Sequence, residues 1–287
     1  MSVILQLILN GVMTGALLAV PAIGFSAMFA VLRYPNFAIA SYATVGAFAA
    51  WVVNTKSGFG VGPSIAVAFC VAALVGALCE RAAMTPLRPS GPLAAAIASI
   101  ALGVVLENVV RFAFGNDLKA YDLPILRDMR FGDIRIGPQQ AQNAAIAVGI
   151  MVAVFAFLRL TRVGRAMRAV ADNPDLARLK GIVPARVELA AVLVGCGLCG
   201  AGGVLIGLDT SIDPLTGFRV LLAVFAAAVL GGLGSVPGAV VGAFALGVAE
   251  ELSLLAVAPT YRAAVGFLVI LIMLTFRPRG IMGDRFA

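Results

Sequence analysis

Side chains that could carry out catalysis are sparse in this sequence. None of the 287 residues is a histidine, which excludes Ser-His and Cys-His nucleophile pairs, the HExxH motif and every histidine-ligated metal site. A GxxxxGK[ST] loop is absent too, so the chain cannot hold ATP by that route. Cys196 and Cys199 have CxxC spacing, but glycines and an apolar run surround them, and helix packing explains them better than a zinc site. We expect no enzyme activity, no metal site and no cofactor bound by this chain.

Ionisable residues inside apolar runs are the remaining candidates for function, because charge is costly in lipid. Glu107, Asn108 and Arg111 lie in one such run, and Glu107 and Arg111 are four residues apart, on one face of a helix. They form either a satisfied pair near the outer end of a span or a contact for a transported solute. Glu250 and Glu251 lie towards the outer end of a later run, where an external vestibule or headgroup water could solvate them.

Uncharged polar residues cluster after the first interruption of the apolar pattern. Asn36, Ser41, Tyr42 and Thr44 offer hydrogen bonds without charge, as a path for a small polar or zwitterionic solute requires. Small polar residues also hold helices together, and this alternative stays open. Our candidates for a translocation path are Asn36, Phe37, Ser41, Tyr42, Thr44, Glu107 and Asn108.

Composition identifies the elements that must position these groups. The chain is 61% apolar and 12% charged, with a mean hydropathy of +1.04, whereas soluble chains carry about 25% charged residues. A span needs about 20 apolar residues, and spans must be helical because an open sheet edge stays unsatisfied in lipid. We predict an all-α transmembrane bundle of eight or nine helices, the first of them a retained span rather than a signal peptide. The expected spans are 3–32, 37–53, 63–84, 92–114, 141–160, 187–208, 220–232, 237–257 and 261–276.

Basic residues set the expected orientation, because cytoplasmic connections retain lysine and arginine. The most basic connection, 159–186, holds Arg159, Arg162, Arg165, Arg168, Arg178, Lys180 and Arg186. Alternation from there places the connection 80–91 and the C-terminus in the cytoplasm, and the N-terminus and 115–140 outside. The net charge of +7 is explained by this topology and by contact with lipid, so we expect no nucleic-acid binding.

Turn-forming residues interrupt the apolar pattern at 33–37 and 231–238. Each stretch is either a helix break at membrane depth, of the kind that lines translocation paths, or an ordinary turn between helices.

The basic connection has a local pattern of its own. Alanines and other apolar residues alternate with arginines over 162–171 at the spacing of a short amphipathic helix. Asn173-Pro174 predicts an N-cap followed by proline at the first helical position, and Gly181 predicts a C-cap. Two short helices with apolar faces outside the membrane need a partner, which is either the lipid interface or another protein.

Motifs in this connection carry a resemblance to a known family. Gly164-Arg-Ala-Met-Arg-Ala-Val-Ala171, followed by Asp172, Ala177 and Gly181-Ile182, resembles the coupling segment of LivH-type permeases, subunits of ABC importers for branched-chain and other hydrophobic amino acids. One departure is that the family usually reads Asn-Phe-Ala-His-Gly where this chain has Ile39 and Ala40 in the last two places. Further matching motifs are Asn10-Gly11, Asn36-Phe-Ala38, Gly46-Ala47, Glu80-Arg81, Pro86-Leu-Arg88, Leu230-Gly-Gly-Leu-Gly234, Pro237-Gly-Ala239 and Phe276-Arg-Pro-Arg-Gly280.

The resemblance implies a single inner-membrane permease domain over residues 1–287, with 161–186 as its cytoplasmic coupling segment. It implies a LivM-type paralogue, two cytoplasmic ABC ATPases that bind ATP and Mg, and an extracytoplasmic solute-binding protein as partners. The residues expected to contact the ATPases are Arg165, Ala166, Arg168, Ala169, Asp172, Leu176, Ala177 and Gly181.

The expected function is that of a permease subunit in ATP-driven import of amino acids, branched-chain or other hydrophobic and neutral ones first. Because of the change at Ile39 and Ala40, urea and small organic acids stay open as solutes, as does pairing with a second copy instead of a paralogue. An autonomous channel, an ion-coupled carrier and a membrane scaffold are alternatives of a different class.

Overall fold

Helices make up almost all of the structure. The computed structural model describes residues 2–122, 129–131, 134–256, 258, 261–277 and 280–282. Within these residues a helix coincides with each of the nine expected spans, and six helical stretches are long and apolar enough to cross a membrane. The predicted transmembrane helical bundle is thus confirmed. Its apolar helices are α1 (Ser2–Leu32), α2 (Ile39–Ser57), α3 (Val61–Cys79), α5 (Pro92–Phe114), α6 (Pro138–Leu160), α9 (Pro184–Asp209), α10 (Thr216–Gly231), α11 (Val236–Ser253) and α12 (Arg262–Phe276).

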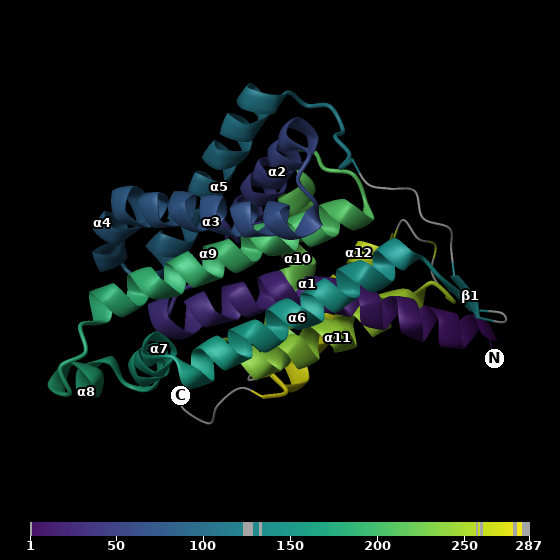
Figure 1. Cartoon of the computed structure of the whole chain (residues 1–287). Helices are drawn as coiled ribbons and strands as arrows, with labels where there is room; N and C mark the ends of the chain where they lie inside the picture. The colour runs from purple at the N-terminus through teal and green to yellow at the C-terminus, as the bar shows by residue number, and fades with distance from the viewer. Residues whose placement is uncertain are drawn as a thin grey trace.

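The two ends of the bundle carry different small elements. Between α6 and α9 lie the short helices α7 (Arg162–Asp172) and α8 (Pro174–Leu179), at the end where α6 finishes and α9 begins (Figure 1). The opposite end holds the start of α1 and an unexpected pair of antiparallel strands, β1 (Met129–Phe131) and β2 (Ile134–Ile136). Gln6 of α1 fixes β2 there, because its amide group donates to the carbonyl of Arg135 and accepts from the amide of Arg135.

Helix α9 lies at the centre of the bundle, where it packs on α1, α2 and α3. Glycines allow this close approach: a Cβ at Gly46 of α2 would lie only 2.4 Å from the Cα of Gly200. Cys196 and Cys199 are free thiols, fully buried on α9, and the Cys196 Sγ lies 3.9 Å from the Met28 Sδ of α1. The CxxC pair therefore lies in a helix-packing contact, as the glycines around it indicated.

Residues 80–91, expected to be an ordinary connection, are helical over most of their length. Helix α3 continues through a π-helical turn, η1 (Glu80–Met84), into α4 (Thr85–Leu87) and a 3₁₀ turn, η2 (Arg88–Ser90). The expected span 63–84 already included residues 80–84, and the helical turns continue beyond it as far as Ser90. The structure buries Glu80 and pairs it with Arg88.

The two interruptions are both turns between helices, at the end of the bundle that carries α7 and α8. The first joins α1 to α2, and its Arg33 has a φ of 61°, unusual for a residue other than glycine. The second joins α10 to α11, and a later segment covers it, since the amides of Ile281 and Met282 donate to the carbonyls of Leu230 and Gly231. The turn interpretation accounts for both stretches.

The carboxylates of α11 lie near the end of the span, as expected, but are largely buried. Glu250 and Glu251 are each only 6% exposed, and Glu251 lines a pocket together with Asn10 and Asp209. Helix α12 packs on α11, and a Cβ built at Gly266 of α12 would lie 3.6 Å from the Glu250 Oε1. The sequence pattern placed both residues near the end of a span but could not show that α12 packs against Glu250.

Candidate functional site

Helix α7 is held in place from both ends. Thr161 caps its N-terminus by accepting a hydrogen bond from the Gly164 amide at 3.0 Å. Met167 and Val170 are buried beneath it, and its arginines are exposed. At its C-terminus, Arg33 donates through Nη2 to the carbonyl of Ala171 at 2.7 Å, where a positive charge suits the helix dipole. Helix α7 is therefore attached to the turn between α1 and α2.

Helix α8 has the two caps that its sequence predicts. The Asn173 side chain accepts hydrogen bonds from the amides of Asp175 and Leu176, both at 3.0 Å. At the other end Gly181 has a φ of 81°, and the Ile182 amide donates to the carbonyl of Ala177. This pattern is a Schellman motif, in which glycine adopts the left-handed conformation that other residues avoid.

The surface of α8 is apolar where it is exposed. Leu176 is 54% exposed and Leu179 83% exposed, although neither lies in an apolar span. Ala177, a predicted contact residue, is buried beneath α8 and is not at the surface. Leu179 was not among the predicted contacts, and its spacing of three residues from Leu176 is the signal that identifies it. The other predicted contacts are exposed at Arg165, Arg168, Asp172 and Gly181 and half-buried at Ala166 and Ala169.

A buried ion cluster lies where α9 begins, directly after α8. Arg88 donates to Glu80 at 2.5 Å and also to Glu188, in the second turn of α9. Tyr34, beside Arg33, donates its hydroxyl to the second oxygen of Glu80 at 3.2 Å. Burial, and next the Glu80 carboxylate, raise the pKa of the Tyr34 phenol, which keeps this donor protonated. The cluster joins the α1–α2 turn, the end of α3 and the start of α9.

The predicted path residues lie around α2, on the buried side of the bundle. Asn36 accepts from the Ala38 amide, and the amide of Phe37 donates to Ser99 of α5. Tyr42 is buried, with 1% exposed. These residues lie near the start of α2, where the hydrogen bonds tie the α1–α2 turn to α5.

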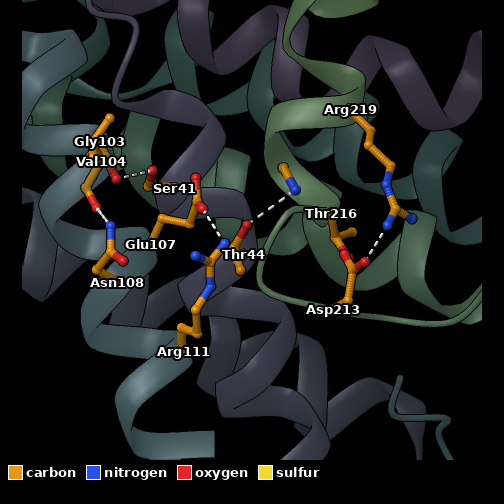
Figure 2. Close-up of polar contacts among 11 residues, drawn as sticks. Ser41, Thr44, Gly103, Val104, Glu107, Asn108, Arg111, Asp213, Thr216 and Arg219 are labelled. Atoms are coloured by element: carbon orange, nitrogen blue, oxygen red, sulfur yellow. Dashed lines mark hydrogen bonds and ion pairs between the residues drawn. The ribbon is translucent and has the colours of Figure 1, made fainter. Parts of the chain in front are cut away.

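The next turn of α2 contacts both α5 and α10, as Figure 2 shows. Ser41 donates to the carbonyl of Gly103 at 2.7 Å. Thr44 accepts a hydrogen bond from the Gly217 amide at 3.0 Å, at the first turn of α10. The polar groups of α2 thus locate both neighbouring helices at one level of the bundle.

Two ion pairs lie on the helices beside α2. Glu107 and Arg111 of α5 pair at 2.7 Å, as their spacing predicts, and Asn108 donates to the carbonyl of Val104. The second pair, between Asp213 and Arg219 (Figure 2), was missed by the sequence analysis. The seventh expected span begins at residue 220, so both charges lie outside it.

Asp213 organises the segment that leads into α10. Its Oδ1 accepts from the hydroxyl of Thr216, which in turn accepts from the Asp213 amide at 2.7 Å. Its Oδ2 accepts from Arg219. The side chain of Asp213 is 10% exposed and that of Arg219 is 59% exposed, so the pair has one buried and one open end.

The fold defines a class of protein. It is a multi-pass helical membrane protein with a pair of capped amphipathic helices at one end. The chain belongs to the family described as "Branched-chain amino acid transport system / permease component", whose model matches residues 7–274. Members of this family are permease components, and this chain is a transport subunit and not an enzyme.

Curated relatives cover almost the whole chain. It is 32% identical to the "High-affinity branched-chain amino acid transport system permease protein LivH" of Salmonella typhimurium, over 97% of this chain and 95% of the relative. It is 30% identical to the corresponding BraD protein of Pseudomonas aeruginosa, with the same coverage. Among solved structures, "PsaBC from Streptococcus pneumoniae in complex with Fab" matches with a TM-score of 0.51 at 14% identity, over 94% of this chain and 92% of the other. This last likeness concerns the fold alone.

Proposed function

We propose that this chain is a permease subunit of an ATP-driven ABC importer that carries branched-chain or other hydrophobic, neutral amino acids across the bacterial inner membrane. The whole chain, 1–287, is then one permease domain. The observation that carries the proposal is the exposed apolar surface of α8, at Leu176 and Leu179, in a chain whose relatives are named as amino acid permeases. Such a surface outside the spans needs a protein or a lipid partner.

The proposed coupling segment is 161–186, and its partner is a cytoplasmic ATPase. Defined caps at Asn173 and Gly181 support a protein partner, because they fix one geometry for α8. The exposed arginines of α7 and the exposed leucines of α8 form the docking surface, and Ala177 acts from beneath it by packing. ATP and Mg bind to the ATPases in this scheme.

The proposed assembly contains a LivM-type permease, two ATPases and an extracytoplasmic solute-binding protein. The basic content of α7 and α8 supports a cytoplasmic position for them. The N-terminus and β1–β2 then face outwards, and the chain after α12 returns to the cytoplasm.

Reconstitution of the complete importer in proteoliposomes tests the function. We expect uptake of radiolabelled leucine that requires internal ATP, both ATPases and the solute-binding protein. Urea and 4-methylpentanoate, offered with the same binding protein, test the two other solute classes. Leucine flux through this chain without the ATPases would contradict the proposal in favour of a channel or carrier.

A further inference from the structure

The Asp213–Arg219 pair lies near the middle of the membrane-spanning bundle. Helix α5 is about 33 Å long at 1.5 Å per residue, and Gly103 lies about halfway along it. Ser41 binds that residue, and Thr44, one turn further along α2, binds the Gly217 amide. Helix α10 therefore begins close to the midpoint of α5, and Arg219 follows three residues after its first residue.

An arginine at this level cannot face lipid chains at low cost. The Arg219 side chain is 59% exposed, and a guanidinium in the centre of a bilayer needs water, protein or a polar ligand around it. Its exposed end must therefore lie against a partner subunit or a water-filled path. Apolar neighbours on the same helix, Phe218 and Leu222, are exposed as well.

The pair has donors left for a ligand. A guanidinium carries five N–H groups, and within the described part of the chain only Nη2 of Arg219 is bonded, to Asp213. On the other side of α2, Glu107 accepts from Arg111, whose Nε is buried without a hydrogen-bond partner. Two parallel N–H groups of an arginine fit a carboxylate.

Charge balance selects the class of ligand. Each pair is neutral as it stands, so a solute with net charge would leave an uncompensated charge in a medium of low dielectric. A zwitterion adds no net charge and matches both partners of the pair. Its carboxylate suits the guanidinium, its ammonium group suits a carboxylate, and an apolar side chain suits Phe218 and Leu222.

We propose that Arg219 and Asp213 recognise the carboxylate and ammonium groups of a zwitterionic α-amino acid halfway across the membrane. This inference rests on the proposed function, and it names the residues that recognise the solute inside the permease. It also favours amino acids over urea and organic acids.

The test compares three forms of the complete importer in proteoliposomes: the wild type, the double variant Asp213→Asn with Arg219→Gln, and Arg135→Gln. The double variant replaces the ion pair with two amides that can still hydrogen-bond, so it leaves no unpaired charge in the bundle. Arg135 is exposed at the end that carries β1–β2 and serves as the matched control. Leucine-loaded binding protein is supplied at saturation, so that its own affinity for leucine does not set the rate.

We expect the double variant to co-purify with its partners and to transport about tenfold less leucine per ATP hydrolysed, while Arg135→Gln behaves as wild type. Arg219→Lys keeps the charge but not the two parallel donors, and should lower the same ratio by a smaller factor. Wild-type ratios in both Arg219 variants would overturn the inference. Loss of co-purification would also overturn it, since the pair would then be a subunit contact. Failure of the wild-type importer to take up leucine would instead refute the proposed function.

Discussion

Two ion clusters of this chain, each with a buried carboxylate, are built in opposite ways. At the α7–α8 end, Arg88 binds Glu188, 100 residues away in the sequence, and also Glu80 in a neighbouring segment. In the middle of the bundle, Arg219 binds Asp213, six residues away, within one segment. The Arg88 side chain is 23% exposed and the Arg219 side chain 59% exposed.

This difference separates a structural joint from an accessible site. A guanidinium shared between two carboxylates of different helices has few donors left and fixes those helices relative to each other. A pair within one segment fixes nothing beyond that segment and leaves its arginine open. We infer that the Arg88 cluster holds α9 in register with α3 and the α1–α2 turn, so that a movement of α8 reaches the bundle.

Removal of the Arg88 guanidinium should have the largest effect of the changes that test this comparison. In Arg88→Met, the buried carboxylate of Glu80 loses its only cationic partner among the residues that the structure describes. Breaking a buried pair in this way costs about 3 kcal/mol or more. We expect the free energy of unfolding, measured by SDS titration in mixed micelles, to fall by about that amount.

The matched control is Arg81→Met, one residue after Glu80 and exposed. A surface change of this kind should alter the free energy of unfolding by about 0.5 kcal/mol at most. Equal losses of unfolding free energy in the two variants would show that Arg88 does not hold these helices together. The contrast with Arg219 would then disappear.

A second prediction concerns whether a movement of α8 is transmitted to the ion cluster around Arg88. Ala169→Glu together with Leu176→Glu places charge on the docking faces of α7 and α8. We expect the subunit to fold but ATP-driven leucine uptake to fall about tenfold or more, as for a central interface contact. Uptake at the normal rate would contradict the docking assignment.

Its control puts the same two charges at the opposite end of the bundle. Thr55→Glu with Ser57→Glu changes exposed, uncharged residues in the last turn of α2 and should leave uptake and assembly unchanged. Leu179→Glu is the sharper single variant, because 83% of Leu179 is exposed and little of it packs against the described part of the chain. It should lower uptake without a change in unfolding.

Local pattern was enough to predict most of the architecture. Each apolar run of adequate length became a helix, because the backbone polar groups of a span must bond within the span. The caps of α8 at Asn173 and Gly181 were equally predictable, since both act through backbone groups only a few residues away. The Glu107–Arg111 pair follows the same rule of short range.

Contacts between distant segments could not be predicted in this way. The cluster of Arg88 and Glu188 depends on how α9 crosses α3, which residue spacing within one segment does not report. Glu250 is buried because α12 packs over it. Asp213 and Arg219 were left outside a span because α10 is short and begins within the bundle, a position that hydropathy does not report.

The smallest predicted effect concerns the rigidity of α8, which the transmission of force to α9 requires. Asn173→Ala removes the side-chain acceptor for two amides of the first turn, which costs about 1 kcal/mol. Local opening of 174–179 should then be about fivefold more frequent, seen as faster amide hydrogen exchange by mass spectrometry. Asn173→Asp keeps the acceptor and should exchange as wild type does. If exchange in α8 were the same in Asn173→Ala as in Asn173→Asp, then packing of Ala177 and not the cap would hold this helix in place.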